Sequence, residues 1–128
     1  MARKFTREEV NNRLKETLKR GKPIIIAGAG DGFSAKLEEK GGVDIIGVYN
    51  SGRFRHFGAG SLSGLMPVGR NQDMVMEYAG EVLSMVTQTP VIAGFCAQDS
   101  RTLWEYWFNN LMAMGMSGFM NFPTVGLI

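Results

Sequence analysis

The sequence lacks most of the features that mark secreted and membrane-spanning proteins. Among its 128 residues Cys96 is the single cysteine, so an internal disulfide is excluded. The longest uninterrupted apolar run is only a few residues, whereas a transmembrane helix needs about 20. The amino terminus is charged and has no apolar signal core. These absences predict a cytoplasmic protein in a reducing compartment, without a membrane partner.

Charge of either sign is scarce and scattered, whereas glycine is abundant. The 14 Lys and Arg residues and 12 Asp and Glu residues leave a net charge of +2. Nucleic-acid binding normally requires a clustered basic surface, so we expect no nucleic-acid partner. The 17 glycines gather where apolar runs end, a placement typical of tight turns and of close backbone approach.

Apolar runs alternate with helical patterns along the chain. Thr6 can cap a first helix, with Glu9 reaching back to it, and Gly21 can end that helix. Further helices are predicted over 33–40, from Asn71 or Gln72 onward, and after a cap at Asp99 or Ser100. Continuous apolar runs, typical of strands buried on both faces, predict strands over 23–27, 44–49, 90–95 and 118–122.

This order of elements predicts an α/β fold in which helices cover a parallel sheet. An open doubly wound sheet and part of a (β/α)8 TIM barrel both fit. The chain ends soon after the fourth strand, and a four-stranded piece of a barrel leaves two edges open. We therefore expect one domain over 1–128, the truncated N-terminal half of a barrel with about four parallel strands. Such a fragment has to pair, so we also expect a homo-oligomer.

In both architectures ligands bind in the loops that follow the strands. Asp31 and Asp99, the two acids at strand ends, and His56 are the candidate catalytic residues. A helix cap for Asp99 and a solvated loop histidine for His56 are the alternative interpretations. The four segments that follow the predicted strands are 28–34, 50–70, 96–99 and 121–124.

The first of these segments is rich in glycine and suits an anion. Gly28, Gly30 and Ser34 are candidate substrate-binding residues, because backbone N–H groups can approach an anion before a helix. The spacing from Gly30 to Ala35 also loosely matches a dinucleotide fingerprint. That fingerprint needs an acid at the end of the second strand, where this chain has Asn50, so NAD binding loses its main support. A tight turn for helix packing is the alternative.

The second segment, 50–70, is unusually long for a loop and carries hydrogen-bonding side chains. Asn50, Ser51 and Gly52 offer neutral hydrogen-bonding groups, and Arg53 and Arg55 offer planar forks for a carboxylate or phosphate. In an extended segment both arginines point to the same side. A solvated loop is one alternative, and an RNA-binding loop with steep salt dependence is another.

Three runs of sequence carry a family likeness: GAGDGFSAKLEEKGGVDIIGVYNSGRFRHFGAGSLSGLMPVG, TPVIAGFCAQD and GFMNFPTVGLI. Together they resemble the phosphoenolpyruvate hydrolase-like TIM-barrel family over nearly all of the chain after about Pro23. That family is related in fold to phosphoenolpyruvate mutase and isocitrate lyase. It also occurs as the C-terminal domain of two-domain proteins with a Tm-1-like, ATP-binding first half.

The resemblance implies a barrel enzyme of hydrolase type acting on a small phosphorylated or carboxylated oxo-acid. Arg53 and Arg55 would bind its carboxylate or phosphate, and Asp99 or Asp31 would act as acid–base or metal ligand. The related mutases and lyases hold Mg²⁺ with clustered acids, so a divalent metal such as Mg²⁺ is implied, but no such acid cluster occurs here. The alternative is a non-catalytic, ligand-sensing or regulatory barrel, which fold alone cannot separate from an enzyme.

Overall fold

The computed structural model describes residues 4–127 and confirms the predicted alternation of helices and strands. The elements, with η for 3₁₀ helices, are α1 (Arg7–Lys19), β1 (Ile26–Ala29), α2 (Gly32–Gly41), β2 (Ile45–Val48), α3 (Asn50–Arg55), η1 (Ser61–Leu65), α4 (Asn71–Met85), β3 (Val91–Gly94), α5 (Trp104–Met114), β4 (Gly118–Met120) and η2 (Val125–Leu127).

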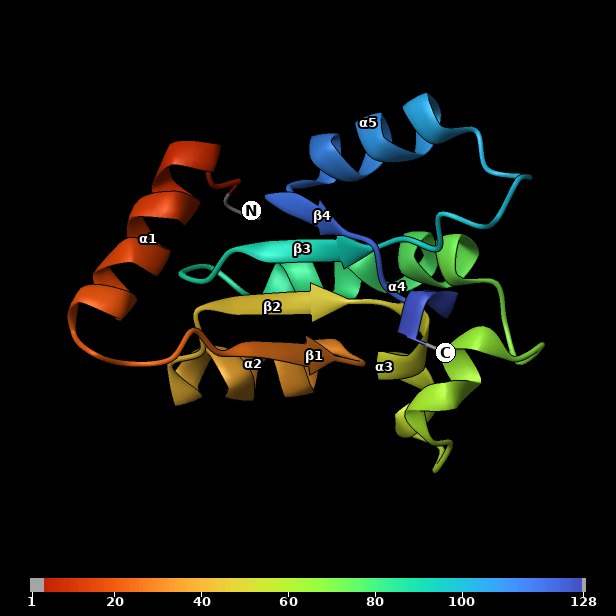
Figure 1. The fold of residues 1–128 in the computed structure, drawn as a ribbon, viewed down its shortest axis with the longest axis horizontal. Coiled ribbons are helices and arrows are strands. Elements are labelled where there is room, and N and C mark those ends of the chain that lie inside the picture. Colours follow the sequence, from red (N-terminus) through yellow and green to blue (C-terminus); the bar gives the residue numbers. More distant parts are fainter. Residues whose placement is uncertain (1–3, 128) are drawn as a thin grey trace.

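The four strands form one parallel sheet in the order β1-β2-β3-β4. Gly28 of β1 pairs with Gly47 of β2, and Gly47 in turn pairs with Ile92 of β3. Each strand lies next to its neighbour in sequence, as in a (β/α)8 barrel, whereas a doubly wound sheet reverses its order at a switch point. The fold is therefore α/β and corresponds to a partial barrel. The carboxyl ends of all four strands meet at one edge, on the right in Figure 1.

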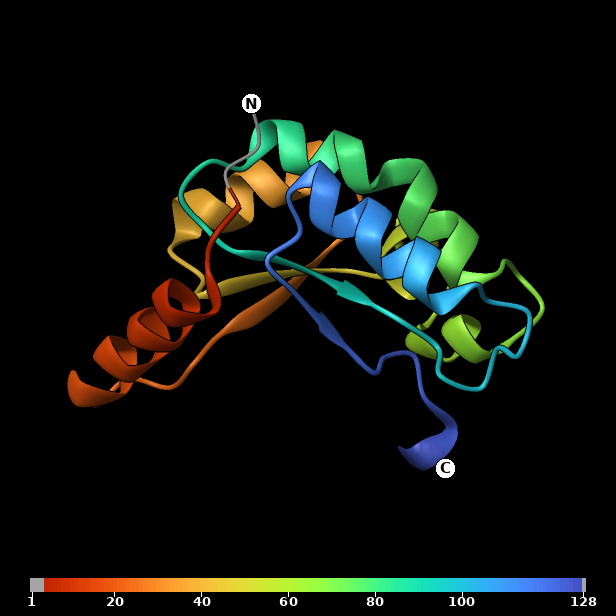
Figure 2. The same ribbon diagram turned by 90° about the horizontal axis from the view of Figure 1, so that it is seen from above.

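Helices α2, α4 and α5 form a layer over one face of the sheet (Figure 2). Their amphipathic faces bury the core against the strands. Within the described residues no helix is long and apolar enough to cross a membrane. The core side chains that are entirely inaccessible to solvent include Ile46, Val48, Val75, Val82, Leu111 and Met116.

The first strand differs from its prediction in both position and burial. It begins at Ile26, and Ile24, Ile25 and Ile26 have exposed fractions of 37%, 51% and 52%. A continuous apolar strand is buried on both faces only when other parts of the protein cover both faces and strands flank both edges. β1 lies at the edge of the sheet, and the helical layer covers one face, so the predicted two-sided burial is wrong for this strand.

Helix starts were predicted correctly for α1 and wrongly for α5. The side chain of Thr6 accepts a hydrogen bond from the third helical residue, which completes the expected capping box. Helix α5 begins at Trp104 after Leu103, which provides no side-chain cap. The predicted cap at Asp99 or Ser100 is therefore wrong.

Helix α1 lies at the amino ends of the strands, opposite the edge where the strands terminate (Figure 1). The hydroxyl of Thr17 donates to Asp44 Oδ1 at 2.5 Å, and the backbone N–H of Ile25 donates to Asp44 Oδ2 at 2.9 Å. Burial of Asp44 acts to raise its pKa, but these hydrogen bonds outweigh it and lower the pKa below its ordinary value. This buried carboxylate therefore ties α1 to the start of β1.

We predict that Asp44→Asn lowers the free energy of unfolding by about 1–3 kcal/mol at neutral pH, because it leaves a buried donor unsatisfied. The stabilisation from Asp44 is complete above the ordinary aspartate pKa and is lost as pH falls through the lowered pKa of the folded state. The difference between wild type and variant should therefore shrink below about pH 4. Urea unfolding at pH 7 and pH 3 measures it, with exposed Glu77→Gln as control. Equal stabilities at pH 7 would contradict it.

Candidate active-site edge

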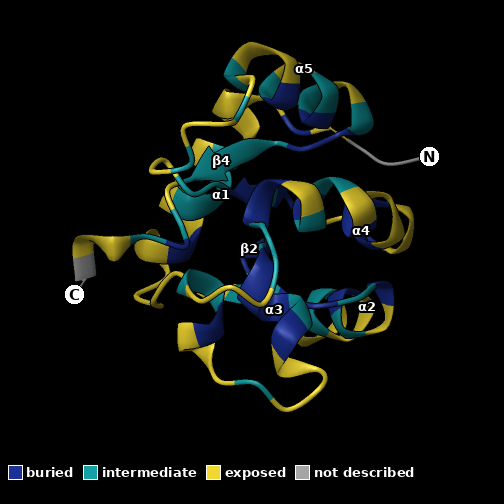
Figure 3. Cartoon of the chain, turned by 90° about the vertical axis from the view of Figure 1, so that its right-hand side faces the viewer, coloured by how far each residue is buried: buried dark blue, intermediate teal, exposed yellow. Residues whose placement is uncertain are grey.

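The four segments that follow the strands meet at the carboxyl edge of the sheet. Figure 3 looks onto this edge and shows buried residues of β2 and α3 at its centre, with exposed segments around them. The backbone N–H of Ala97 donates to the side chain of Asn121 at 3.4 Å, and the side-chain amide of Gln98 donates to Thr124 at 3.5 Å. The loops after β3 and β4 are therefore joined to each other.

Segment 50–70 is folded rather than an extended loop, and the predicted alternation of its arginines is wrong. It consists mainly of helices α3 and η1. Asn50 is fully buried between them, and its side-chain amide donates to the carbonyl of Gly64 at 2.9 Å. The backbone N–H of Asn50 donates to Asn71 Oδ1 at 2.9 Å, which attaches α3 to α4. These contacts give Asn50 a structural role, whatever else it binds.

Ser51 and Gly52 follow Asn50 and lie beneath the surface of this edge. Ser51 is fully buried, and its hydroxyl has no hydrogen-bond partner within residues 4–127. A Cβ on Gly52 would lie 2.9 Å from the carbonyl oxygen of Ala29, so only glycine lets α3 pack this closely on β1.

Arg53 is committed to contacts within the chain. Its guanidinium donates to the carbonyl of Gly30 at 2.9 Å and lies 3.5 Å from a carboxylate oxygen of Glu81. It also lies 5.2 Å from the centre of the Tyr78 ring. The same Glu81 accepts from the backbone N–H of Gly32 at 3.0 Å. Arg53 therefore joins the loop after β1 to helix α4.

His56 and Asp31, both predicted as catalytic residues, lie together. His56 Nδ1 is 2.9 Å from Asp31 Oδ2, although the two residues come from different βα units. Asp31 also caps α2 by accepting from the backbone N–H of Ser34 at 2.7 Å, and this bond is the main reason that its pKa is lowered. Gly30 permits the approach, because a Cβ there would lie 2.5 Å from the His56 ring.

Arg55 lies beside Tyr49, over the first strand. One of its terminal nitrogens donates to the Tyr49 hydroxyl at 3.3 Å, and the other donates to Ser61 Oγ at 3.4 Å. A Cβ on Gly28 would overlap the Tyr49 hydroxyl oxygen at 1.9 Å. The predicted residues Gly28 and Arg55 are therefore brought together through Tyr49.

Asp99 contacts other residues than the His56–Asp31 pair does. Its carboxylate accepts from Arg70 Nε, and Arg101 Nε lies 3.4 Å from its second oxygen. Burial acts to raise the pKa of Asp99, but the hydrogen bonds from Arg70 and from the backbone of Arg101, together with the charges of both arginines, outweigh it and lower the pKa. The three residues line a groove of about 530 Å³ between the segment after η1 and the loop after β3.

Three residues that position this edge were not singled out as site residues from the sequence. Tyr78 donates to the carbonyl of Tyr49 at 2.7 Å and accepts from its backbone N–H at 3.0 Å. Gln72 accepts from the backbone N–H of Cys96 at 3.2 Å, and Arg70 binds Asp99. The helical spacing placed Tyr78 on the inner face of its helix, but no local pattern indicates partners more than 20 residues away.

The side chains at this edge do not fit a metal ion. In the described part of the chain no three His, Cys, Asp or Glu side chains come together as ligands. The two predicted acids bind different partners, Asp31 to His56 and Asp99 to Arg70. Mg²⁺ prefers several oxygen ligands in octahedral geometry, and the described side chains at this edge do not offer them.

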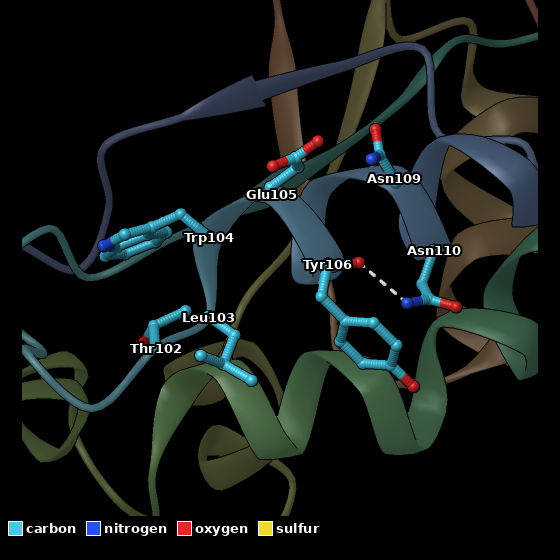
Figure 4. Close-up of a pocket in the computed structure, with 7 residues that line it drawn as sticks. All are labelled: Thr102, Leu103, Trp104, Glu105, Tyr106, Asn109 and Asn110. Atoms are coloured by element: carbon cyan, nitrogen blue, oxygen red, sulfur yellow. Dashed lines mark hydrogen bonds between the residues drawn. The ribbon is translucent and has the colours of Figure 1, made fainter.

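A second depression, of about 780 Å³, lies on the outer side of α5 (Figure 4). Leu103 and Tyr106 are its most exposed apolar side chains, and Glu105 is its only charged residue. It contains none of the residues predicted to bind substrate.

Comparison with known proteins identifies the family. The family model described as phosphoenolpyruvate hydrolase-like matches residues 9–128. The ToMV resistance protein Tm-1(GCR237) of Solanum lycopersicum is 50% identical over 121 residues, which cover 94% of this chain and 16% of that protein. The ToMV susceptible protein tm-1(GCR26) of the same plant is 51% identical over 115 residues, or 90% and 15%. The matched segment thus spans about a sixth of these relatives, and the chain belongs to the phosphoenolpyruvate hydrolase-like family.

Proposed function

We propose that this chain provides the catalytic edge of a barrel enzyme that acts on a small phosphorylated or carboxylated oxo-acid. The observation that carries the proposal is the His56–Asp31 contact of 2.9 Å at the carboxyl edge of the sheet. Active sites of barrels lie at this edge, and the family is described as phosphoenolpyruvate hydrolase-like. The arginine Arg55 lies in the same region.

In this proposal His56 is the general acid–base and Asp31 orients it. When Nδ1–H of His56 donates to Asp31, the tautomer is set and Nε2, which lies beside Gly30, is left to take or give a proton. Asp31 stays ionised, because its hydrogen bond from Ser34 lowers its pKa. In hydrolysis of phosphoenolpyruvate, water attacks phosphorus and the bond from phosphorus to the enol oxygen breaks. His56 Nε2 would give a proton to the departing enol oxygen, which leaves as enolpyruvate and tautomerises to pyruvate, while the attacking water loses its proton to solvent.

Substitution of either residue tests the role of this pair. His56→Asn should lower kcat for release of phosphate from phosphoenolpyruvate by about 10²- to 10⁴-fold. Asp31→Asn should lower it too, because a neutral amide stabilises the imidazolium less well. A coupled assay for phosphate and pyruvate measures both, with Glu77→Gln as control on the exposed face of α4. Unchanged turnover in His56→Asn would contradict the assignment.

A further prediction uses the close packing of Gly30 on His56. In Gly30→Ala the new methyl group would lie 2.3 Å from the Gly52 carbonyl oxygen and 2.5 Å from the His56 ring, so His56 must move. We expect kcat to fall by about tenfold or more, because misplacement by 1 Å is costly in catalysis. Gly60→Ala is the matched control, since a Cβ there meets nothing within 4 Å. Equal turnover in the two variants would show that the position of His56 is unimportant.

A ligand-sensing barrel is the second candidate, and the state of Asp99 favours it. Arg70 and Arg101 both pair with this carboxylate, so it is less available as an acid–base. Only the His56–Asp31 pair then remains for proton transfer among the predicted catalytic residues. Binding of phosphoenolpyruvate by the wild-type chain without release of phosphate would favour this candidate over the enzyme.

A further inference from the structure

We propose that Arg55, Tyr49 and Ser61 form the subsite that takes the phosphoryl group of the ligand. The three side chains already contact one another at the carboxyl edge of the sheet, through the two hydrogen bonds that Arg55 donates. This inference rests on the proposed function and names both the group recognised and the residues that recognise it.

Among the described arginines at this edge, Arg55 is the one whose guanidinium contacts no carboxylate. Its guanidinium donates only to the neutral hydroxyls of Tyr49 and Ser61, and within residues 4–127 no carboxylate lies within 4.0 Å of it. Glu38 interacts with it electrostatically at longer range. Arg53, by contrast, is committed to a backbone carbonyl and to a carboxylate. The remaining N–H groups of Arg55 are suited to an oxyanion.

Tyr49 is held so that its hydroxyl faces the same space as Arg55. Its ring packs edge-on against Phe122, with 4.8 Å between ring centres, and its hydroxyl lies on the backbone of Gly28. The hydroxyl accepts from Arg55 at 3.3 Å, so its own hydrogen remains available to a ligand. The guanidinium lies 5.6 Å from the centre of the same ring, which further fixes the pair.

The spacing from Gly28 to Gly30 links this subsite to His56. The Tyr49 hydroxyl and Arg55 lie at Gly28 of β1, whereas the His56 ring lies at Gly30, just after the strand ends. Two residues of extended chain span at most about 7 Å. A ligand whose phosphoryl group sits on Arg55 therefore extends its carbon skeleton toward His56. This distance suits a three-carbon acid such as phosphoenolpyruvate.

The donors favour a tetrahedral dianion over a planar carboxylate. Arg55, Tyr49 and Ser61 come from three different positions and can each donate to a different oxygen of one phosphoryl group. A carboxylate carries a smaller charge and its acceptor sites lie in one plane, so it fits donors from three directions less well. We therefore expect inorganic phosphate and phosphoenolpyruvate to bind, and pyruvate to bind much more weakly.

The test is binding of inorganic phosphate to the whole 128-residue chain, measured by calorimetry and by the shift in Tm. In Arg55→Ala and Arg55→Lys we expect Kd for phosphate to rise about ten- to hundredfold, because charge-assisted, bidentate hydrogen bonds are lost. Tyr49→Phe should raise Kd by about three- to tenfold, through loss of one hydroxyl donor. The exposed Arg101→Ala is the matched arginine control and should leave Kd unchanged.

Two further variants separate binding from folding. Arg53→Ala should lower Tm without ligand yet keep the shift that phosphate produces, because Arg53 serves the fold. Gly28→Ala places a methyl group on the Tyr49 hydroxyl and should raise Kd about as much as Tyr49→Phe. Circular dichroism of each variant shows whether it folds. Wild-type affinity for phosphate in folded Arg55→Ala, or an equal loss in Arg101→Ala, would overturn the proposal.

Failure of this subsite and failure of the proposed function give different results. If phosphate binding depends on Arg55 but the wild type releases no phosphate from phosphoenolpyruvate, the subsite stands and the enzymatic function fails. If turnover falls in His56→Asn but the Kd for phosphate is unchanged in Arg55→Ala, the function stands and this subsite is wrong.

Discussion

The hydroxyl of Tyr78 is the contact on which the carboxyl edge of the sheet depends. From helix α4 it bonds both the carbonyl and the N–H of Tyr49, where β2 ends and α3 begins. Burial raises the pKa of Tyr78, so the hydroxyl stays protonated and able to donate. Helix α3, which carries Arg53 and Arg55, and His56 after it continue the chain from this junction. The hydroxyl thus fixes the point from which the candidate binding groups extend.

The charged residues at this edge divide into those that hold the fold and those that face a ligand. Arg53 and Arg70 bond to groups of neighbouring loops and helices, and Asp99 is paired with Arg70. Arg55 and His56 remain exposed, Arg55 beside Gly28 of β1 and His56 beside Gly30 just after it. Arginine suits both tasks, because its planar fork binds carbonyls and carboxylates within the chain as well as oxyanions from outside it.

Much of the fold could be predicted from local patterns, and the segment from 50 to 70 could not. Apolar runs and amphipathic repeats identified the strands and helices within a few residues, and the Thr6 capping box was correct. Segment 50–70 has no helical repeat, so its helices were missed. They depend on distant contacts, such as the bonds from Asn50 to Gly64 and to Asn71. Propensity in a short helix is weak and tertiary contacts decide.

The sequence by itself determined the order of strands and helices, the family, and the set of loops that gather at one edge. Alternation of strands with helices leads to a parallel sheet, whose strands end together. Only the tertiary structure decided which polar residues face outward. It engaged Arg53 with Gly30, buried Asn50 and Ser51, and joined His56 to Asp31. Hydrogen bonds between residues far apart in the chain determine which polar groups remain available to a ligand. No local pattern encodes those pairings.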